Sequence, residues 1–268
     1  MARIELPQSR LRTRRRRRRL IVLGVVLIST GVVLAGIVAL THAPFLEINS
    51  IEIAGTKSVA SSSVRDVVQS ALAGSYLYVL PHDNIFIYPN KAIAATLLKK
   101  FPEFKSADVY AVDFHTIAVD VAEREPMALW CSGGGDCNFM DEDGVVYATA
   151  PQGSGQVFVT YQGTSTGVGL PKQFLTPEEF RSLAALVTAL SAGEPAGPVR
   201  MVVVDQANDV RAYFQNDFLL IFALASAGGD VFERFNLALK ADPFKNHKLS
   251  DFEYLDLRWG DKLYYKLK

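Results

Sequence analysis

Leu20 to Leu40 reads LIVLGVVLISTGVVLAGIVAL, a run of 21 residues without one charged side chain. At about 1.5 Å per residue, a helix of this length crosses a hydrocarbon core about 30 Å thick. A cleavable signal peptide is the alternative, but its apolar run is shorter, at about 7–15 residues. The sequence Thr41-His42-Ala43 is also a poor cleavage site. The pattern therefore predicts a single-pass membrane protein with residues 20–40 as its transmembrane helix.

Charge is distributed unevenly around this helix. Nine of the 28 basic residues but one of the 28 acidic residues precede Leu20, and Arg14 to Arg19 form an unbroken run. Because positively charged flanks stay on the cytoplasmic side, we expect residues 1–19 to be a basic cytoplasmic tail, disordered and attracted to anionic lipid heads. The chain after about Thr41 is then exported. The rest of the chain carries 19 basic and 27 acidic residues, a balance that argues against a nucleic-acid partner.

The first exported segment, residues 45–125, has the pattern of a β-α-α-β-β unit. A strand from Glu47 to Ala54 precedes a helix with an apolar stripe from Val64 to Leu72. A second helix begins at Asn90 and is stopped by Pro102. Two strands follow, the first over Val109 to Phe114 and the second with Ile117, Val119 and Val121 on one face. Such a unit packs two helices on one face of a small three-stranded sheet.

The second exported segment, residues 126–268, changes to short strands and turns with two flanking helices. One helix opens at Thr176 with a capping box, and the other starts near Asp230 and is expected to bury Phe232, Phe235 and Leu239. Strands are predicted at Met127–Trp130, Val145–Ala148, Gln156–Tyr161, Arg200–Val204, Val210–Phe214 and Phe218–Ala223. The predicted fold class is therefore α+β, with a mixed or antiparallel β-domain in this segment.

The chain ends in a predicted β-hairpin that turns at Gly260-Asp261. Its apolar face is formed by Leu255, Leu257, Trp259, Leu263, Tyr265 and Leu267, and its polar face by Asp256, Arg258, Lys262, Tyr264 and Lys266. We expect Leu255, Leu257, Leu263 and Tyr265 to anchor the hairpin on its domain. A last strand is expected at a sheet edge, where its backbone can pair with a partner strand. The alternative is an edge that Lys262, Lys266 and Lys268 protect from pairing.

Catalytic and metal-binding patterns are missing from the sequence. The four histidines, His42, His82, His115 and His247, lie too far apart for a local zinc pattern. Asp141-Glu142-Asp143-Gly144 resembles a calcium loop without its later ligands, and a turn between strands explains it better. We therefore expect no enzyme activity, no metal and no cofactor.

Cys131 and Cys137 flank the glycine-rich tip Gly133-Gly134-Gly135. They lie on the predicted oxidising side of the membrane and close a short loop, so a disulfide is favoured over free thiols.

Four motifs give the chain a resemblance to the FtsQ/DivIB family of bacterial cell-division proteins. They are the stretch from Phe45 to Gly55, FLEINSIEIAG; Val119-x-Val121-x-Glu123-Arg124-x-Pro126-x-Ala128-x-Trp130; Asp141-x-Asp143-Gly144-Val145-Val146-Tyr147; and Leu255-Asp256-Leu257-Arg258-Trp259. The resemblance implies that residues 45–125 form a POTRA domain and residues 126–268 a β-domain. The paired cysteines are not part of the family pattern.

The resemblance also implies a function, that of a non-enzymatic divisome scaffold at the septum. Such a scaffold joins the FtsB/DivIC and FtsL proteins and regulates septal peptidoglycan synthesis. The side chains expected to contact a partner are Tyr254, Asp256, Arg258, Trp259 and Tyr264. For Trp259 there is an alternative: it falls on the same face of the strand as Leu255, so it can instead be a core residue. The alternative functions are a membrane-anchored cell-wall enzyme and another POTRA-containing envelope assembly factor.

Overall fold

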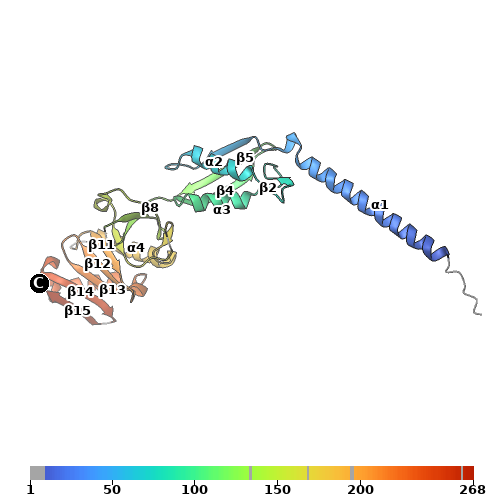
Figure 1. Cartoon of the computed structure of the whole chain (residues 1–268). Helices are drawn as coiled ribbons and strands as arrows, with labels where there is room; N and C mark the ends of the chain where they lie inside the picture. Colours follow the sequence, from blue (N-terminus) through green and yellow to red (C-terminus); the bar gives the residue numbers. More distant parts are fainter. Residues whose placement is uncertain (1–9, 133–134, 168, 194–195, 261) are drawn as a thin grey trace, which may run out of the picture. The chain divides into compact units, whose positions relative to one another are not determined.

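The computed structural model describes residues 10–132, 135–167, 169–193, 196–260 and 262–268 (Figure 1). Side chains are described from Arg14 onward. The chain divides into two compact units. Unit 1 runs to Lys100 and also holds Ser106–Ala122, and unit 2 holds Phe101–Lys105 and Glu123–Lys268.

The first helix, α1, spans Arg10–Thr41. Its segment Arg14–Thr41 is long and apolar enough to cross a membrane. The predicted tail is therefore helical from Arg10 onward and not disordered, because arginine is a good helix former and extends the helix of the apolar segment. Residues 1–9 of that tail lie outside the described residues.

Unit 1 contains the predicted β-α-α-β-β order. Its elements are β1 (Ser50–Ala54), α2 (Ser61–Leu72), α3 (Asn90–Lys100), β4 (Phe104–Ala111) and β5 (Thr116–Glu123). The first two residues of β4 and the last residue of β5 belong to unit 2. The sheet order is β1-β5-β4, with β1 parallel to β5. As the apolar spacing predicts, α2 buries Val64, Val67, Val68 and Leu72.

Three features of unit 1 differ from the expectation. β1 begins at Ser50 rather than Glu47, and β4 begins five residues before the predicted Val109. A short hairpin of β2 (Ser75–Tyr76) and β3 (Leu80–Pro81) lies between the two helices. The short 3-10 helix η1 (Pro44–Leu46) lies between α1 and β1.

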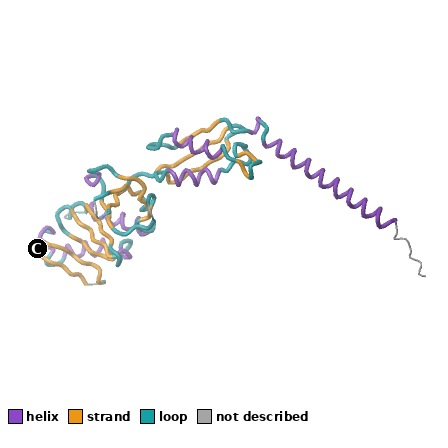
Figure 2. The backbone as a smooth tube through the Cα atoms, in the orientation of Figure 1, coloured by secondary structure: helices purple, strands orange, loops and turns teal. Residues whose placement is uncertain are grey.

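Unit 2 is built on a sheet that has ten strands within the described residues (Figure 2). The strands are β6 (Ala128–Cys131), β7 (Cys137–Met140), β8 (Val145–Thr149), β9 (Thr160–Gln162), β10 (Lys172–Gln173), β11 (Val199–Val204), β12 (Asp209–Phe214), β13 (Leu219–Ala223), β14 (Phe252–Trp259) and β15 (Lys262–Leu267). Their order is β10-β8-β7-β6-β9-β11-β12-β13-β14-β15. β9 is parallel to β6 and β11, and β13 is parallel to β14, so the sheet is mixed.

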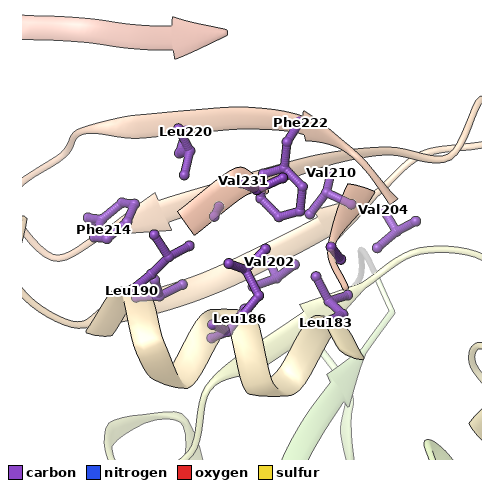
Figure 3. Packing of buried hydrophobic residues seen from close by; sticks show 14 of the residues in the cluster. Leu183, Leu186, Leu190, Val202, Val204, Val210, Phe214, Leu220, Phe222 and Val231 are labelled. Carbon is purple, nitrogen blue, oxygen red and sulfur yellow. The ribbon is translucent and has the colours of Figure 1, made fainter. Parts of the chain in front are cut away.

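Two helices complete unit 2, α4 (Pro177–Ala192) and α5 (Val231–Lys240). Thr176 accepts a bond from the backbone nitrogen of Glu179 and closes the predicted capping box of α4. Leu186 and Leu190 of α4 point toward Val202 and Phe214 of the sheet, in one continuous core (Figure 3). The short 3-10 helices are η2 (Ser154–Gln156), η3 (Leu224–Ser226), η4 (Phe244–Asn246) and η5 (Leu249–Asp251).

Some predicted elements of unit 2 are wrong in detail. β7 was not expected, and the predicted strand Gln156–Tyr161 is reduced to β9 (Thr160–Gln162). The buried residues of α5 are Val231, Phe235 and Ala238, whereas Phe232 is exposed and Leu239 is partly buried. The helix begins at Val231, so its buried stripe runs through positions i, i+4 and i+7 from that residue.

Candidate protein-binding edge

The last strand, β15, lies at one end of the sheet order in unit 2. It pairs antiparallel with β14, which in turn pairs parallel with β13. In the part of the chain that the structure describes, no strand pairs with the outer side of β15. An edge of this kind presents backbone donors and acceptors to which another strand can bind. The expected position of the last strand is therefore confirmed.

A bulge in β14 decides which of its side chains face the core. Asp256 is opposite Tyr264 and Trp259 is opposite Lys262, so β14 has one extra residue between these two pairs. The extra residue breaks the strict alternation of faces. As a result, Trp259 does not continue the buried face of Leu255 and Leu257. Asp256, before the bulge, is only 5% exposed. Trp259 is 60% exposed, and the view that it is a core residue is wrong.

Arg258 lies in a cluster with two carboxylates. Its Nη2 is 2.6 Å from Oδ2 of Asp256, its Nε donates to Oδ1 of Asp256 at 3.0 Å, and its Nη1 pairs with Asp209. Burial raises the pKa of Asp256, but the hydrogen bonds and charge of Arg258 outweigh this effect and hold the pKa below its ordinary value. Much of Arg258 is thus engaged inside its own domain. Asp209 was not identified from the sequence, because it belongs to a distant strand.

The face of the hairpin that carries Trp259 also presents two of the other predicted contact residues. Tyr264 is exposed and Tyr254 is half-buried. The guanidinium carbon of Arg258 lies 5.8 Å from the centroid of the Trp259 ring. Lys266 pairs with Glu253, and this bond raises the pKa of the lysine. Of the five predicted contact residues, the structure exposes Trp259 and Tyr264, leaves Tyr254 and Arg258 partly exposed, and buries Asp256.

The opposite side of β15 is less buried than expected. Leu263, Tyr265 and Leu267 are all exposed, and Tyr265 packs its ring 5.4 Å from Phe244 and 5.9 Å from Phe252, measured between centroids. The prediction that Leu263 and Tyr265 anchor the hairpin on its domain therefore holds only in part, because both side chains contact the domain but neither is buried. Leu255 and Leu257 of β14 are the buried anchors.

A groove of about 360 Å³ lies between α5 and the hairpin. It is lined by Asp230, Arg234, Leu237, Ala238, Ala241, Leu257, Lys262 and Leu263. Leu237 is 65% exposed, and Arg234 donates to the carbonyl of Gly260 at the hairpin turn. We call this feature the α5–β15 groove. Sequence reasoning missed it because it assigned the wrong stripe of α5 to the core.

The cysteine pair lies in the same sheet, away from this edge in strand order. Cys131 and Cys137 are opposite one another on β6 and β7, with their Cα atoms 4.1 Å apart, and form a disulfide. Residues 133 and 134 of the predicted glycine tip are outside the described part of the chain.

The acidic motif at Asp141 is a turn, as predicted. Oδ1 of Asp141 accepts bonds from the backbone nitrogens of Asp143 and Val145, each at 2.9 Å. Its Oδ2 lies 2.5 Å from Nη1 of Arg124. The carboxylate is therefore occupied by protein donors, and across the described residues no group of three or more His, Cys, Asp or Glu side chains is arranged to hold a metal.

Comparison with known proteins links the chain to a cell-division protein. No family model matches the chain. A protein of Streptomyces collinus described as "Cell division protein FtsQ" is 27% identical over 209 residues, which cover 76% of this chain and 74% of the relative. This similarity extends across both units, and the apolar helix, mixed α+β fold and large terminal sheet agree with it. The chain is therefore similar, at a distance, to FtsQ cell-division proteins, and this similarity supports its resemblance to the FtsQ/DivIB family.

Proposed function

We propose that this protein is a non-enzymatic scaffold of the bacterial division machinery, anchored at the septal cytoplasmic membrane by α1. Residues 45–125 act as its POTRA domain and residues 126–268 as its β-domain, both outside the cytoplasm, while residues 1–19 stay inside. The similarity to the FtsQ protein supports the division role. The helix Arg14–Thr41 supports the single membrane anchor.

The partner in this proposal is a small bitopic division protein of the FtsB/DivIC type, together with an FtsL-type protein. An extended segment of the partner adds to the outer side of β15, so that its backbone continues the sheet. The observation that carries the proposal is the position of β15, a six-residue strand at the open end of the sheet order. Through this complex, the scaffold regulates septal peptidoglycan synthesis.

Side chains next to β15 support the same interaction. The α5–β15 groove offers the exposed apolar surface of Leu237 and Leu263, which an apolar anchor of the partner would cover at about 25 cal/mol for each Å² removed from water. On the other side, Trp259 and Tyr264 are exposed. Exposed aromatic side chains of this kind often dominate the binding energy of an interface.

The test uses the full-length protein in detergent or nanodiscs and the FtsB/DivIC-type protein of the same host. Leu263→Asp places a charge in the α5–β15 groove, and we expect it to weaken binding about 10- to 100-fold, or about 1.4–2.8 kcal/mol. Val157 is 80% exposed elsewhere in unit 2, so Val157→Asp is the matched control and should leave the affinity unchanged. Unchanged binding after deletion of Leu263 to Lys268, in a domain that still unfolds cooperatively, would contradict the proposed edge.

Depletion in cells separates this proposal from a membrane-anchored cell-wall enzyme. Loss of a division scaffold should produce filaments, because septa are not completed. Loss of an enzyme should instead alter the chemistry of the wall while septation continues. The second outcome would overturn the proposed function whatever happens at β15.

A further inference from the structure

The turn of the β2–β3 hairpin in unit 1 exposes large apolar side chains. Leu77 is 88% exposed and Tyr78 is 99% exposed, and Tyr76 and Val79 beside them are also exposed. Leucine and tyrosine side chains this accessible are costly to leave in water, because apolar surface is driven out of it. We call residues 76–79 the hairpin tip.

The backbone of this tip is unusual for its residues. Leu77 and Tyr78 both have positive φ angles, 50° and 62°. They are the two central residues of a β-turn that is closed by a bond from the backbone nitrogen of Val79 to the carbonyl of Tyr76 at 3.0 Å. A β-turn with positive φ at both central residues favours Asn-Gly there, because a side chain such as leucine is strained. Strained, exposed residues concentrate at functional sites. Folding alone therefore does not explain why leucine and tyrosine occupy this turn.

The loop that carries the tip is bonded to the segment that follows α1. The backbone nitrogen of Ile85 donates to Leu46 at 2.9 Å, and that of Ile48 donates to Asp83 at 2.7 Å. The side chain of Asn84 donates to the carbonyl of Thr41, the last residue of α1, at 2.9 Å. Thr41 and Leu46 are five residues apart, which is at most about 17 Å of extended chain. The loop therefore lies close to the end of the membrane-spanning helix.

Other exposed aromatic residues lie in the same segments. Phe45 is exposed in η1, and Phe86 is exposed in the loop, with its ring centroid 6.3 Å from that of Phe114. Between Ser75 and Pro89 the sole Asp, Glu, Lys or Arg is Asp83. This surface is aromatic and nearly uncharged, the composition that favours the interface between water and the bilayer.

We propose that the hairpin tip, with Phe45 and Phe86, inserts into the outer leaflet and holds the POTRA domain against the membrane. The ligand is the lipid surface itself. Because the loop has almost no cationic charge, insertion is driven by apolar burial and is insensitive to salt and to anionic lipid. This inference goes beyond the scaffold function and depends on it for one point alone, that α1 crosses the membrane.

The experiment places an environment-sensitive fluorophore on the full-length protein in vesicles of neutral phosphatidylcholine. One sample carries the label at Val79→Cys, in the tip. The control carries it at Ser62→Cys, an exposed position near the start of α2, whose opposite end adjoins the hairpin. The native cysteines are joined in a disulfide and do not take the label. We expect the tip label alone to shift its emission to the blue and to be quenched by shallow spin-labelled lipids.

A second variant separates insertion from folding. Leu77→Asn with Tyr78→Gly installs the pair that this turn prefers. The melting temperature should stay the same or rise, while the quenching at position 79 is lost. A fall in stability with quenching retained would show that the two residues serve the fold, and would overturn the proposal.

The remaining outcomes are also decisive. Equal quenching of both labels, or quenching that requires anionic lipid, contradicts insertion driven by the apolar tip. Quenching that disappears when each vesicle holds one chain would show that a second copy, not lipid, covers the tip. Failure of α1 to span the membrane is detected separately, by the protease experiment described in the Discussion.

Discussion

Arg258 and Asp256 lie two residues apart on β14, and Nη2 of the arginine is 2.6 Å from Oδ2 of the carboxylate. Arg258→Glu would place a third acid beside Asp256 and Asp209. We expect it to reduce the free energy of unfolding by about 2–4 kcal/mol, because it leaves buried charge unpaired. Chemical denaturation of the full-length protein measures this loss. Any weakening of partner binding by Arg258→Glu therefore includes this loss of stability.

Trp259→Ala is the informative comparison for that variant. Trp259 is largely exposed, so its truncation should change stability by less than about 1 kcal/mol. If it also weakens capture of the partner, the exposed face of the hairpin is part of the interface. A loss of stability as large as that of Arg258→Glu would contradict the position of the ring in the structure.

The same cluster predicts a dependence of stability on pH. The pKa of Asp256 is lowered in the folded state, so its contribution is present above the unfolded pKa, near 3.9, and is lost as the pH falls through the folded pKa. The destabilisation caused by Asp256→Asn should therefore be largest at neutral pH and shrink below about pH 4. Urea unfolding of the two proteins between neutral and acidic pH checks this. Glu253→Gln, on the exposed Lys266 pair, is the control and should change stability by at most about 1 kcal/mol.

Local signals in the sequence predicted most elements correctly. The capping box at Thr176 and the apolar stripe of α2 depend on residues within one or two turns of each other. The bulge in β14 is different, because it is defined by the register against β15. Arg258 and Asp209 are 49 residues apart, and periodicity contains no information on such a pair. The exposed position of Tyr264 was therefore predicted, whereas that of Trp259 was left open between two views and the pairing of Arg258 with Asp209 was not predicted.

The motif that ends at Gly55 has a steric reason in the structure. Gly55 has a φ of +86°, and a Cβ atom there would lie 1.8 Å from the carbonyl oxygen of Val121. We expect Gly55→Ala to cost about 3–5 kcal/mol, from backbone strain and overpacking together. Hydrogen exchange resolved along the chain should show the loss of protection in unit 1. Gly153 has a similar φ of +89° and open space around it, so Gly153→Ala should cost about 1–2 kcal/mol.

Arg124 and Asp141 join two of the family motifs, and both side chains are largely buried. Arg124 also donates from its backbone nitrogen to Glu103 at 2.7 Å. Asp141→Asn should therefore lower stability by about 3–5 kcal/mol, as expected when one partner of a buried pair is removed. Lys105 pairs with Glu142 and Asp143 at the exposed surface, and Lys105→Ala should cost no more than about 1 kcal/mol. Equal effects of the two variants, in thermal or chemical unfolding, would contradict this assignment.

The disulfide should have a modest effect on stability. Cys131 and Cys137 are separated by six positions, and chain-entropy reasoning gives about 2 kcal/mol for so short a loop. Cys131→Ala with Cys137→Ala should therefore lower the free energy of unfolding by no more than this amount. Non-reducing mass spectrometry of protein from the cell envelope should find it about 2 Da lighter than the reduced form, through loss of two hydrogens. Two free thiols in that sample would contradict an oxidised pair in the cell.

The proposed orientation of the chain in the membrane is based on the distribution of charge. Arg14 to Arg19 precede the apolar segment, and the flank after Thr41 contains acidic residues such as Glu47. Because basic flanks are retained in the cytoplasm, protease added to spheroplasts should degrade nearly everything after Thr41 and leave α1 protected. Replacing the six arginines by asparagine and inserting lysines after Thr41 should protect part of the population, because the positive-inside bias is reversed. Full protection of unit 2 in the unaltered protein would show that the β15 edge is not exported. Binding of β15 to a partner segment outside the cytoplasm would then be excluded.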